Sequence, residues 1–526
     1  MSNPALLVGY DRKCVTPAPG TYLGGYGNGK DRQTIGKIFE DDDLFITAIA
    51  MTDPRGETLL LLTVDVVRIP RRGYDDMIDR LTAATGVPAD HILMSATHSH
   101  SSPDFVDGAD YIETWKALFL AQGEAAAVAA LADRKPAQAF GTVREVKDLN
   151  WVRRYMKDGK FLGTNTLGDA HESAADNHLQ LLRFVREGGE DVILCNWGAH
   201  SDHSKCFGGP EGSPTFHRGC SADYNYALRK TVEAETGAKF AFFQAAAGNL
   251  NPISKIESEF YRVRGRMERD DVIRPIAYGR ELAGEVTEAL KGSMMPLSCD
   301  KAVGSYHELP AKRPTGPAVG SPEYNRAYAL SVVAFAQRTL EVPTKESREG
   351  AAFVAQKYEL GDDASVDRLA ADETAEKHDF AVIAKTLRDG GRLPYTSDSS
   401  RTAGFALTKF YGFISGLYSA NGLVSRSENQ DKPPVALPLH AISIGDIAFV
   451  GAPGEIFDTV GAAVKAASPF KMTFYLEMCG GSYGYFGTHL AWSHGGYEIG
   501  GASFAEGTVE AMGEEQLKML KEMKEQ

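Results

Sequence analysis

The sequence predicts an α/β fold in which a mixed β-sheet core is flanked by helices. Short and almost continuously apolar segments, such as Leu59–Val67, have the length and composition of buried strands. Other segments carry an apolar stripe with the helical repeat, as in Ile112, Trp115 and Phe119 at positions i, i+3 and i+7. The two kinds of segment alternate along roughly the first 300 residues, which is the pattern of the α/β class.

The expected elements follow in chain order. Short apolar runs between turn-forming residues predict strands at Leu6–Tyr10, Ala48–Met51, Leu59–Val67, His91–Ala96, Val192–Trp197, Phe240–Gln244 and Met472–Leu476. Apolar residues with a helical period predict helices at 110–134, at Tyr224–Glu235, around Leu282–Leu290, after Glu455 and at the C-terminal end. Gly445 and Asp446 stand between two apolar runs, which predicts a hairpin with a two-residue turn.

Residues 310–435 have a different composition from the rest of the chain. Proline and glycine punctuate both ends of this range, and its middle, GDDASVDRLAADETAEKHD, is highly charged with helical potential. We therefore expect a polar, mostly helical insertion or cap at 310–435. Residues 1–309 and 436–526 are then expected to form one α/β catalytic domain together.

The composition excludes several classes of protein. The 526 residues carry a net charge of −14 without a cluster of lysine or arginine, which argues against a nucleic-acid partner. The richest apolar run is interrupted by Asp65 and is far shorter than the roughly 20 residues that span a bilayer. The first residues lack the pattern of a secretory signal, and the six cysteines show no CxxC pair. We expect a cytoplasmic protein whose oligomeric state the sequence leaves open.

The sharpest motif is SATHSHSSPD, which places His98 and His100 just past an apolar strand. On an extended backbone, side chains two residues apart share one face, so both imidazoles can reach the same point. Histidines at the carboxyl end of a buried strand are well placed to line a crevice. A metal site and a hydrogen-bonded structural pair both remain open for this motif alone. The metallo-β-lactamase pattern is excluded because Ser102 stands where it needs an aspartate.

Two further strand ends offer ligands of the same kind. GAHSDHSKC places His200 just past the strand Val192–Trp197, and His203 and His217 follow it. GAPGE places Glu455 after another strand. Two histidines and one glutamate are the ligand mix of a catalytic zinc site, which keeps one position open for water or substrate. The sequence therefore predicts one Zn²⁺ per chain at these strand ends.

Segments along nearly the whole chain resemble the neutral/alkaline (non-lysosomal) ceramidase family in its N-terminal catalytic domain. The run GVPADHILMSATHSHSSP is similar to the family's THTHSGP region. The remaining similar segments are, in order, VGYDRKCVTPAPGTYLGGYG, NWGAH with SADY, QAAAGNLNP, GDIAFVGAPGE, and GGSYGYFGTH with GGYE. The resemblance implies a ceramidase-type fold without room for the family's C-terminal β-sandwich domain.

The resemblance also implies roles for single residues. It adds Tyr485 as a fourth zinc ligand, with Tyr483 as the alternative, to His98, His200 and Glu455. The residues implied as catalytic or supporting groups are His100 beside the metal, Arg153 near the site with Arg154 as the alternative, and Asp223 as a partner of a ligand histidine. An N-cap of the helix that starts at Tyr224 is the other interpretation of Asp223.

One departure from the family pattern bears on the chemistry. The resemblance places Asn251 where ceramidases carry a catalytically important serine, and Asn249 where they carry an aspartate. Because a carboxamide cannot serve as the nucleophile, we expect a zinc-dependent hydrolase in which the metal activates water for attack on an amide or ester. Arg153, His100 or Asn251 would donate to the developing oxyanion, and His100 or Tyr485 would protonate the leaving group.

The substrate is expected to be a small molecule or a glycoconjugate. Aromatic residues of the loops would suit stacking on a sugar ring and are candidate substrate-binding groups: Tyr26, Tyr483, Tyr485, Phe486, Trp492 and Tyr497. A zinc enzyme acting on a glycan is therefore the first alternative function. A binuclear amidohydrolase-type enzyme and a non-catalytic metal- or carbohydrate-binding protein are the others.

Overall fold

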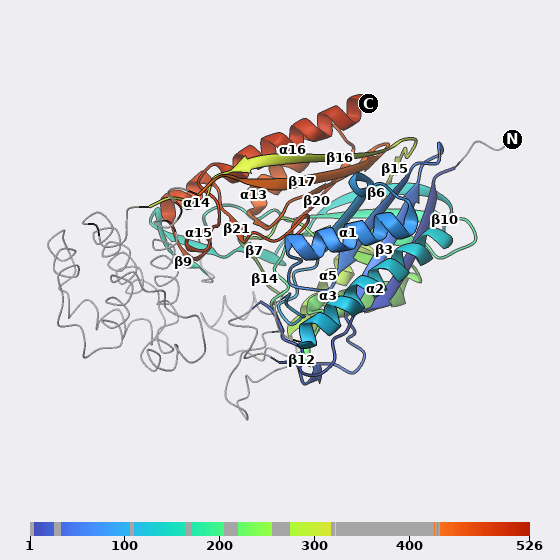
Figure 1. Ribbon diagram of the computed structural model, residues 1–526, viewed down its shortest axis with the longest axis horizontal. Coiled ribbons are helices and arrows are strands. Elements are labelled where there is room, and N and C mark those ends of the chain that lie inside the picture. Colours follow the sequence, from blue (N-terminus) through green and yellow to red (C-terminus); the bar gives the residue numbers. More distant parts are fainter. Residues whose placement is uncertain are drawn as a thin grey trace.

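Two β-sheets pack face to face, and helices cover the outer face of each. The computed structural model describes residues 5–25, 33–105, 110–164, 170–204, 219–254, 274–316, 321, 426, 429 and 432–526. Apolar side chains of both sheets, such as Leu61 and Phe449, belong to one buried core. Figure 1 shows the resulting layers, with the C-terminal helix above the sheets and the first helices below them.

The larger sheet has nine strands and is mixed. In spatial order they are β13 (Lys239–Gln244), β11 (Val192–Trp197), β10 (His178–Arg186), β6 (Lys135–Glu145), β1 (Leu7–Cys14), β3 (Phe45–Thr52), β4 (Thr58–Val64) and β5 (Ile92–Ala96), with β15 (Met295–Leu297) paired to β6. The pairs β4–β5 and β11–β13 are parallel. The sheet curls, since the Thr63 hydroxyl of β4 donates to the Phe242 carbonyl of β13 at 2.7 Å. Strands from opposite ends of the sheet therefore meet.

The smaller sheet has four strands and contributes a third parallel pair of neighbours. Its strands are β16 (Ala302–Ala311), β17 (Val435–Ile444), β18 (Ile447–Gly451) and β20 (Met472–Leu476). The strands β18 and β20 are parallel. The predicted hairpin is confirmed, because β17 and β18 pair antiparallel around Gly445 and Asp446. Gly445 has a φ of 59°, a conformation that glycine adopts without steric cost.

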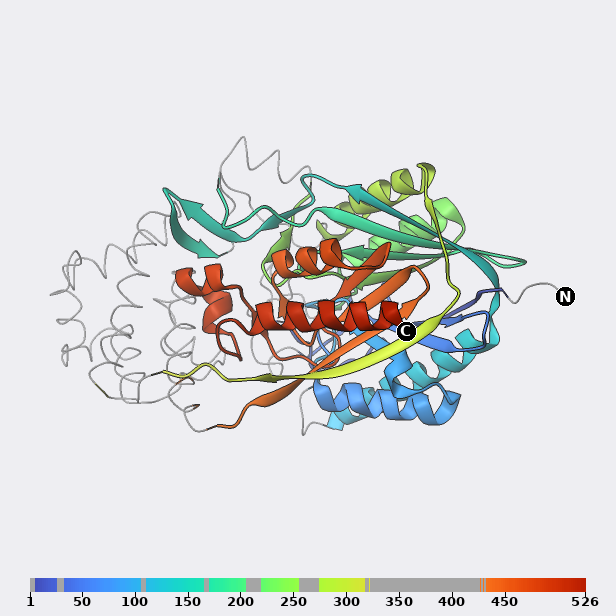
Figure 2. The same cartoon turned by 90° about the horizontal axis from the view of Figure 1, so that it is seen from above.

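Helices seal the outer faces. Those on the larger sheet are α1 (Arg71–Thr85), α2 (Asp110–Ala132), α3 (Tyr224–Thr236) and α5 (Arg274–Lys291), and those on the smaller sheet are α13 (Asp458–Ala467) and α16 (Thr508–Glu525). Figure 2 shows α13 and α16 side by side over the smaller sheet. The buried stripe of α16 includes Met512, Met519 and Met523. Within the described ranges, none of the helices combines the length and apolar character needed to cross a bilayer.

Short elements complete the described chain. They are β2 (Gly36–Lys37), the 3-10 helix Ala89–His91, β7 (Asn150–Val152), β8 (Arg154–Lys157), β9 (Lys160–Thr164), β12 (Gly219–Cys220), β14 (Leu250–Pro252), β19 (Glu455–Ile456), β21 (Tyr485–Phe486), α14 (His489–His494) and α15 (Tyr497–Gly500).

The elements predicted from apolar runs are present, with one informative difference in length. The predicted strand Leu59–Val67 ends at Val64, because the chain turns away where the Asp65 carboxylate accepts a hydrogen bond from Phe45 N at 3.0 Å. The structure adds elements that were not predicted: α1, β6, β10 and β16. β6 and β16 are partly exposed and carry polar residues, so they lack the continuous apolar signal. The predicted insertion at 310–435 lies almost entirely outside the described residues.

Candidate metal centre

The predicted ligands follow strands that end at the same edge of the molecule. His98 follows β5, His200 follows β11, and Glu455 follows β18. The two histidine loops are bonded directly to each other, since His100 N donates to the Ser201 carbonyl at 2.9 Å and the Ser201 hydroxyl donates to the Thr97 carbonyl at 2.9 Å. The curl of the larger sheet thus joins segments that are about a hundred residues apart in the sequence.

Backbone carbonyls fix the orientation of both predicted histidine ligands. The Nδ1 atom of His98 lies 2.8 Å from the carbonyl oxygen of Val67. The Nδ1 atom of His200 lies 2.8 Å from the carbonyl oxygen of Ala247 and 3.0 Å from that of Leu250. A carbonyl only accepts hydrogen bonds, so both Nδ1 atoms carry a proton, and in the neutral imidazoles both Nε2 atoms present a lone pair. In metal-binding histidines the ring nitrogen that does not face the metal usually donates to an acceptor in this way.

The free nitrogens converge on one carboxylate oxygen. Glu455 Oε2 lies 3.5 Å from His98 Nε2 and 3.2 Å from His200 Nε2. His100 Nε2 is 3.1 Å from His98 Nε2. The ligand atoms of His98, His100 and His200 all lie within 4.8 Å of one another, and this is the one group of potential metal ligands found among the described residues. The structure therefore places His100 in the same cluster as the two predicted histidine ligands.

The electrostatics of the cluster fit a cation. Burial lowers the pKa of His100 well below its usual value, and the imidazoles of His98 and His200 lower it further. Burial alone would raise the pKa of Glu455. The neighbouring imidazoles of His98 and His200 outweigh burial and hold this pKa well below its usual range. Burial also acts to lower the pKa of His98, and the Glu455 carboxylate outweighs it and raises that pKa. Lone pairs and an anionic oxygen facing one point in a buried space are a donor set suited to Zn²⁺.

Tyr485 lies beside the carboxylate, and Tyr483 does not contact the cluster. Glu455 and Tyr485 are paired residues of the parallel strands β19 and β21. Burial, followed by the charge of Glu455, raises the pKa of Tyr485 well above its usual value. The ring of Tyr483 instead packs edge-on against Phe504, with ring centroids 5.8 Å apart. Of the two predicted alternatives, Tyr485 is thus the tyrosine adjacent to the candidate site.

Arg153 is buried and spans the wall of the site. Its Nη2 donates to the Tyr485 hydroxyl at 3.1 Å and to the Gly248 carbonyl at 2.9 Å. Its Nε donates to Glu498 Oε1 at 2.9 Å. Its Nη1 lies 3.5 Å from His200 Nε2. The guanidinium is therefore held by three groups on one side and faces the histidine cluster on the other.

Arg154 is also buried, but its ion pairs lie away from the histidine cluster. It pairs with Glu172 at 2.8 Å and with Glu498 at 2.7 Å. Glu498 thus bridges the two arginines from a fully buried position. The fold encloses both Arg153 and Arg154, so neither is a surface charge. Arg153 is the one that contacts Tyr485.

Asn251 and Asn249 have separate environments. Asn251 lies on β14, and its Oδ1 accepts from Arg153 Nη1 at 3.4 Å. The side chain of Asn249 is buried and donates to Asp458 Oδ1 at 2.7 Å, while Asp458 N donates back to Asn249 Oδ1 at 2.9 Å. Asn251 therefore borders the site, and Asn249 joins the site loop to the start of α13.

Of the predicted aromatic residues, Tyr497 borders the site, whereas Trp492 and Phe486 pack elsewhere. The ring of Tyr497 is 5.4 Å from that of Tyr485, and the Arg153 guanidinium lies over it at 5.7 Å. Trp492 instead packs against a separate apolar cluster around Phe457, and the Arg426 guanidinium lies over its indole at 4.9 Å. Phe486 stacks on Phe504. The predicted substrate-binding residue Tyr26 and the candidate ligand His217 lie outside the described residues.

Asp223 acts as a helix cap. It has a φ of 59°, and its Oδ1 accepts from Tyr224 N at 2.7 Å at the start of α3. Its other oxygen accepts from Ser204 N at 2.5 Å. Both carboxylate oxygens thus bind backbone amides. The capping interpretation is confirmed. Burial raises the pKa of Asp223, and the nearby His203 acts to lower it, so this carboxylate also lies close to one of the candidate histidines.

Sequence reasoning missed two buried glutamates of the site. Glu498 fixes Arg153, and its only signal was an acidic residue in a glycine-rich aromatic loop. Glu477 follows β20, and its Oε2 accepts from Ala247 N at 2.9 Å, directly behind His200. Burial raises the pKa of Glu477 to about 8. An acidic residue that ends a fully apolar strand was the signal that could have identified it.

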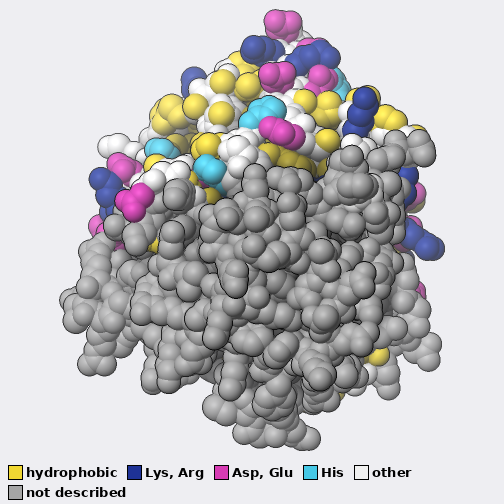
Figure 3. Space-filling model, turned by 90° about the vertical axis from the view of Figure 1, so that its left-hand side faces the viewer, with side chains coloured by type: hydrophobic (Ala, Val, Ile, Leu, Met, Phe, Trp, Pro, Cys, Tyr) yellow, Lys and Arg dark blue, Asp and Glu magenta, His cyan; other side chains and the backbone are white. Residues whose placement is uncertain are grey.

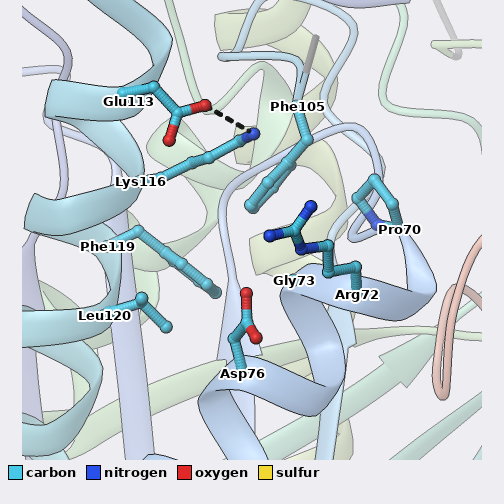
Figure 4. A pocket seen from close by; sticks show the side chains of 9 residues that line it. All are labelled: Pro70, Arg72, Gly73, Asp76, Phe105, Glu113, Lys116, Phe119 and Leu120. Carbon is cyan, nitrogen blue, oxygen red and sulfur yellow. Dashed lines mark hydrogen bonds and ion pairs between the residues drawn. The ribbon is translucent and has the colours of Figure 1, made fainter. Parts of the chain in front are cut away.

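A small pocket of about 140 Å³ lies between α1 and α2, apart from the predicted site residues. Figure 4 shows the apolar and charged side chains that line it. The residues that line it are Pro70, Arg72, Gly73, Asp76, Phe105, Glu113, Lys116, Phe119 and Leu120. It contains none of the ligands described above and is smaller than the usual small-molecule site.

Solved structures of ceramidases share this fold. The chain is similar to the crystal structure of neutral ceramidase from Pseudomonas aeruginosa, with 15% identity and a TM-score of 0.65 over 100% of this chain and 75% of that one. It is also similar to a ceramidase complexed with C2, with 16% identity and a TM-score of 0.64 over 99% of this chain and 75% of that one. No protein-family model and no curated protein sequence matches it. At these identities the comparison confirms the predicted α/β fold of the ceramidase type and leaves membership of the family a prediction.

Proposed function

We propose that this chain is a zinc-dependent hydrolase that cleaves an amide or ester bond of a small-molecule substrate and holds one zinc ion. The observation that carries the proposal is the position of Glu455 Oε2, which lies within 3.5 Å of His98 Nε2 and 3.2 Å of His200 Nε2. Both imidazoles reach this point from loops oriented by backbone carbonyls. A structural histidine pair would not need a third strand end to supply an anionic oxygen to the same point.

His98, His200 and Glu455 would hold the metal, with Tyr485 as the further ligand next to Glu455. Zinc bound there would polarise the scissile carbonyl and lower the pKa of a water molecule from 15.7 to about 7. His100 adjoins this point through its Nε2 and is a candidate to pass a proton to the leaving group. Burial keeps the pKa of its imidazole low, so it acts as a neutral group at rest.

Arg153 is placed to stabilise negative charge that develops on the substrate. Its guanidinium is fixed by Glu498, by the Gly248 carbonyl and by the Tyr485 hydroxyl, so it needs little reorganisation during the reaction. A preorganised donor of this kind contributes roughly 3 kcal/mol to transition-state stabilisation. Asn251 lies next to this guanidinium and offers an amide, not a nucleophile. This agrees with water as the attacking group.

Metal analysis combined with a substrate screen tests the proposal. The purified chain is analysed for zinc and assayed against amides, esters, lactones and glycosides, with and without a chelator. The proposal expects about one zinc per chain and chelator-sensitive cleavage of an amide or ester. It also expects His98→Ala and Glu455→Gln to lose zinc and activity together, whereas the exposed His178→Ala keeps both.

Other outcomes assign the chain to the alternatives. Two metals per chain would indicate a binuclear enzyme, and chelator-sensitive cleavage of glycosides alone would indicate a glycan-acting enzyme. Tight ligand binding without turnover would indicate a binding protein. Full turnover by metal-free protein would overturn the proposal.

A further inference from the structure

Arg68 stands at the edge of the metal centre and has no part in the proposed chemistry. It lies in the loop after β4, and the preceding residue, Val67, supplies the carbonyl that orients His98 at 2.8 Å. The His98 side chain is buried, whereas 49% of the Arg68 side chain is exposed. The loop thus contributes the Val67 carbonyl to the interior of the site and the Arg68 side chain to its surface.

Asp104 fixes the guanidinium of Arg68 along one edge. Arg68 Nε donates to Asp104 Oδ1 at 3.0 Å, and Arg68 Nη2 donates to Asp104 Oδ2 at 2.7 Å. Asp104 is itself buried, and its backbone N donates to the Tyr22 carbonyl at 3.1 Å. A guanidinium has a second donor edge, formed by Nη1 and the remaining hydrogen of Nη2. In the part of the chain that the structure describes, no residue accepts from Nη1 of Arg68.

The pair is built into the same framework as the metal ligands. Asp104 belongs to the loop that carries His98 and His100. Gly24 packs between the two loops, since a Cβ there would lie 2.6 Å from Val67 Cγ1 and 2.9 Å from Asp104 Cβ.

Arg68 also interacts electrostatically with the candidate ligand Glu455. Partial burial lowers the pKa of Arg68, but the carboxylate of Asp104, and behind it that of Glu455, outweigh burial and raise it. A positioned and half-exposed cation therefore lies within electrostatic reach of the predicted ligand Glu455.

We propose that the open edge of Arg68 binds an oxyanion group of the substrate, a carboxylate or a phosphate, close to the bond that the metal centre cleaves. The inference rests on the proposed hydrolase function and names its substrate class as an anionic amide or ester. The flat edge of a guanidinium matches two oxygens of one anion, and such charge-assisted pairs are about twice as strong as neutral hydrogen bonds. The bond to Asp104 sets the direction of that edge before substrate arrives.

A plain surface ion pair is the competing explanation. Ion pairs at the surface contribute little to stability, so Arg68 and Asp104 would then matter little to any ligand. The two explanations differ in selectivity, because only anion binding makes the protein distinguish charged from neutral ligands of equal size.

The experiment compares matched ligands on the zinc-loaded full chain. An N-acylglycine is paired with its neutral primary amide, and an N-acylaminomethylphosphonate forms a third arm. Dissociation constants are measured by calorimetry, and kcat and KM are measured where turnover occurs. The variants are Arg68→Gln and Arg68→Lys, and Arg72→Gln is the control because Arg72 is an exposed arginine nearby.

The wild type is expected to prefer an anionic ligand over the neutral amide, and Arg68→Gln to reduce that preference by about 10- to 100-fold. The loss is expected in KM and in the dissociation constant, with zinc content retained. Arg68→Lys is expected to keep part of the preference, and Arg72→Gln all of it. The carboxylate and phosphonate arms show which anion the site prefers.

Two results would overturn the inference: equal affinity of the wild type for charged and neutral ligands, or the same preference in Arg68→Gln as in the wild type. Failure of the hydrolase proposal looks different. In that case no ligand is cleaved, yet the calorimetric preference for the anion and its dependence on Arg68 persist.

Discussion

The side chains of Glu455 and Tyr485 are neighbours because their strands, β19 and β21, pair in parallel with these two residues in register. The Tyr485 hydroxyl in turn accepts from Arg153 at 3.1 Å, so this short sheet connects the carboxylate at the metal centre to the guanidinium beside it. Gly454 allows the approach, since a Cβ at this position would lie 2.5 Å from the Gly484 carbonyl oxygen. The pairing of β19 with β21 thus positions both the candidate ligand Glu455 and, through Tyr485, the guanidinium of Arg153.

Removal of zinc is expected to destabilise the folded chain. A ligand that binds only the folded state stabilises it by about 4 kcal/mol at a thousand times its dissociation constant. A chelator should therefore lower the Tm of the wild type by several degrees, and His200→Ala should abolish the response. Thermal unfolding with and without chelator measures this.

The matched control is His489→Ala. His489 lies on α14, and 61% of its side chain is exposed. Figure 3 shows histidine and acidic side chains close together on the face of the molecule that it presents. It pairs with Glu506 and has no contact with the cluster. An unchanged chelator response in His200→Ala would contradict the assignment of His200 as a ligand.

Arg153→Lys is expected to lower kcat by about 10²- to 10³-fold with zinc retained. A lysine ammonium cannot donate to Glu498, Gly248 and Tyr485 at once in the geometry of the guanidinium fork. Steady-state kinetics and metal analysis on the same preparation measure both quantities. Arg183→Lys, a partly exposed arginine paired with Asp191, is the control. Wild-type kcat in Arg153→Lys would contradict a role in the transition state.

Gly248→Ala is expected to weaken zinc binding by about 10- to 100-fold although no ligand is removed. A Cβ at this position would lie 2.6 Å from the Glu455 carbonyl oxygen, so the backbone that carries the ligand must shift. Competition with a chromogenic chelator measures the affinity.

Gly284→Ala is the matched control for this substitution. Nothing lies within 4 Å of a Cβ at Gly284, in the middle of α5. Alanine there should leave zinc affinity unchanged and stabilise the fold by about 0.5–1 kcal/mol. Equal zinc affinity of the wild type and Gly248→Ala would show that the glycine does not position Glu455.

Asp42→Asn is expected to change the pH dependence of stability. Burial raises the pKa of Asp42 to about 7, against about 3.9 in the unfolded chain. The protonated form is favoured on folding, so its stabilising contribution is complete below pH 3.9 and is lost as the pH rises to about 7. The Tm of Asp42→Asn relative to the wild type should therefore increase between pH 4 and 7 and stay level above that.

The neighbouring Asp41 provides the contrast. Hydrogen bonds from Lys230 and Tyr226 lower the pKa of this exposed carboxyl to about 2. Its stabilising contribution is present above pH 3.9 and is lost as the pH falls towards 2, so Asp41→Asn should give a flat difference between pH 4 and 7. A flat difference for Asp42→Asn as well would contradict the raised pKa.

The apolar strands were predictable because burial on both faces leaves a continuous signal in the sequence. Val192–Trp197 and Met472–Leu476 have the predicted bounds, and every residue in them is buried. β6 was missed because its polar residues lie on an exposed face and interrupt the signal. The candidate ligands were predictable for a related reason, since His98, His200 and Glu455 each stand in the loop or short segment that comes after such a strand.

The sequence by itself determined which strands are buried and that histidines and a glutamate stand at their ends, because both are local properties of composition and spacing. Only the tertiary structure decided that Tyr485 and not Tyr483 adjoins Glu455, and that Glu498 fixes Arg153 from 345 residues away. These relationships depend on the curl of the larger sheet and on the register of β19 with β21. Such long-range contacts arise from packing, which residue spacing does not encode.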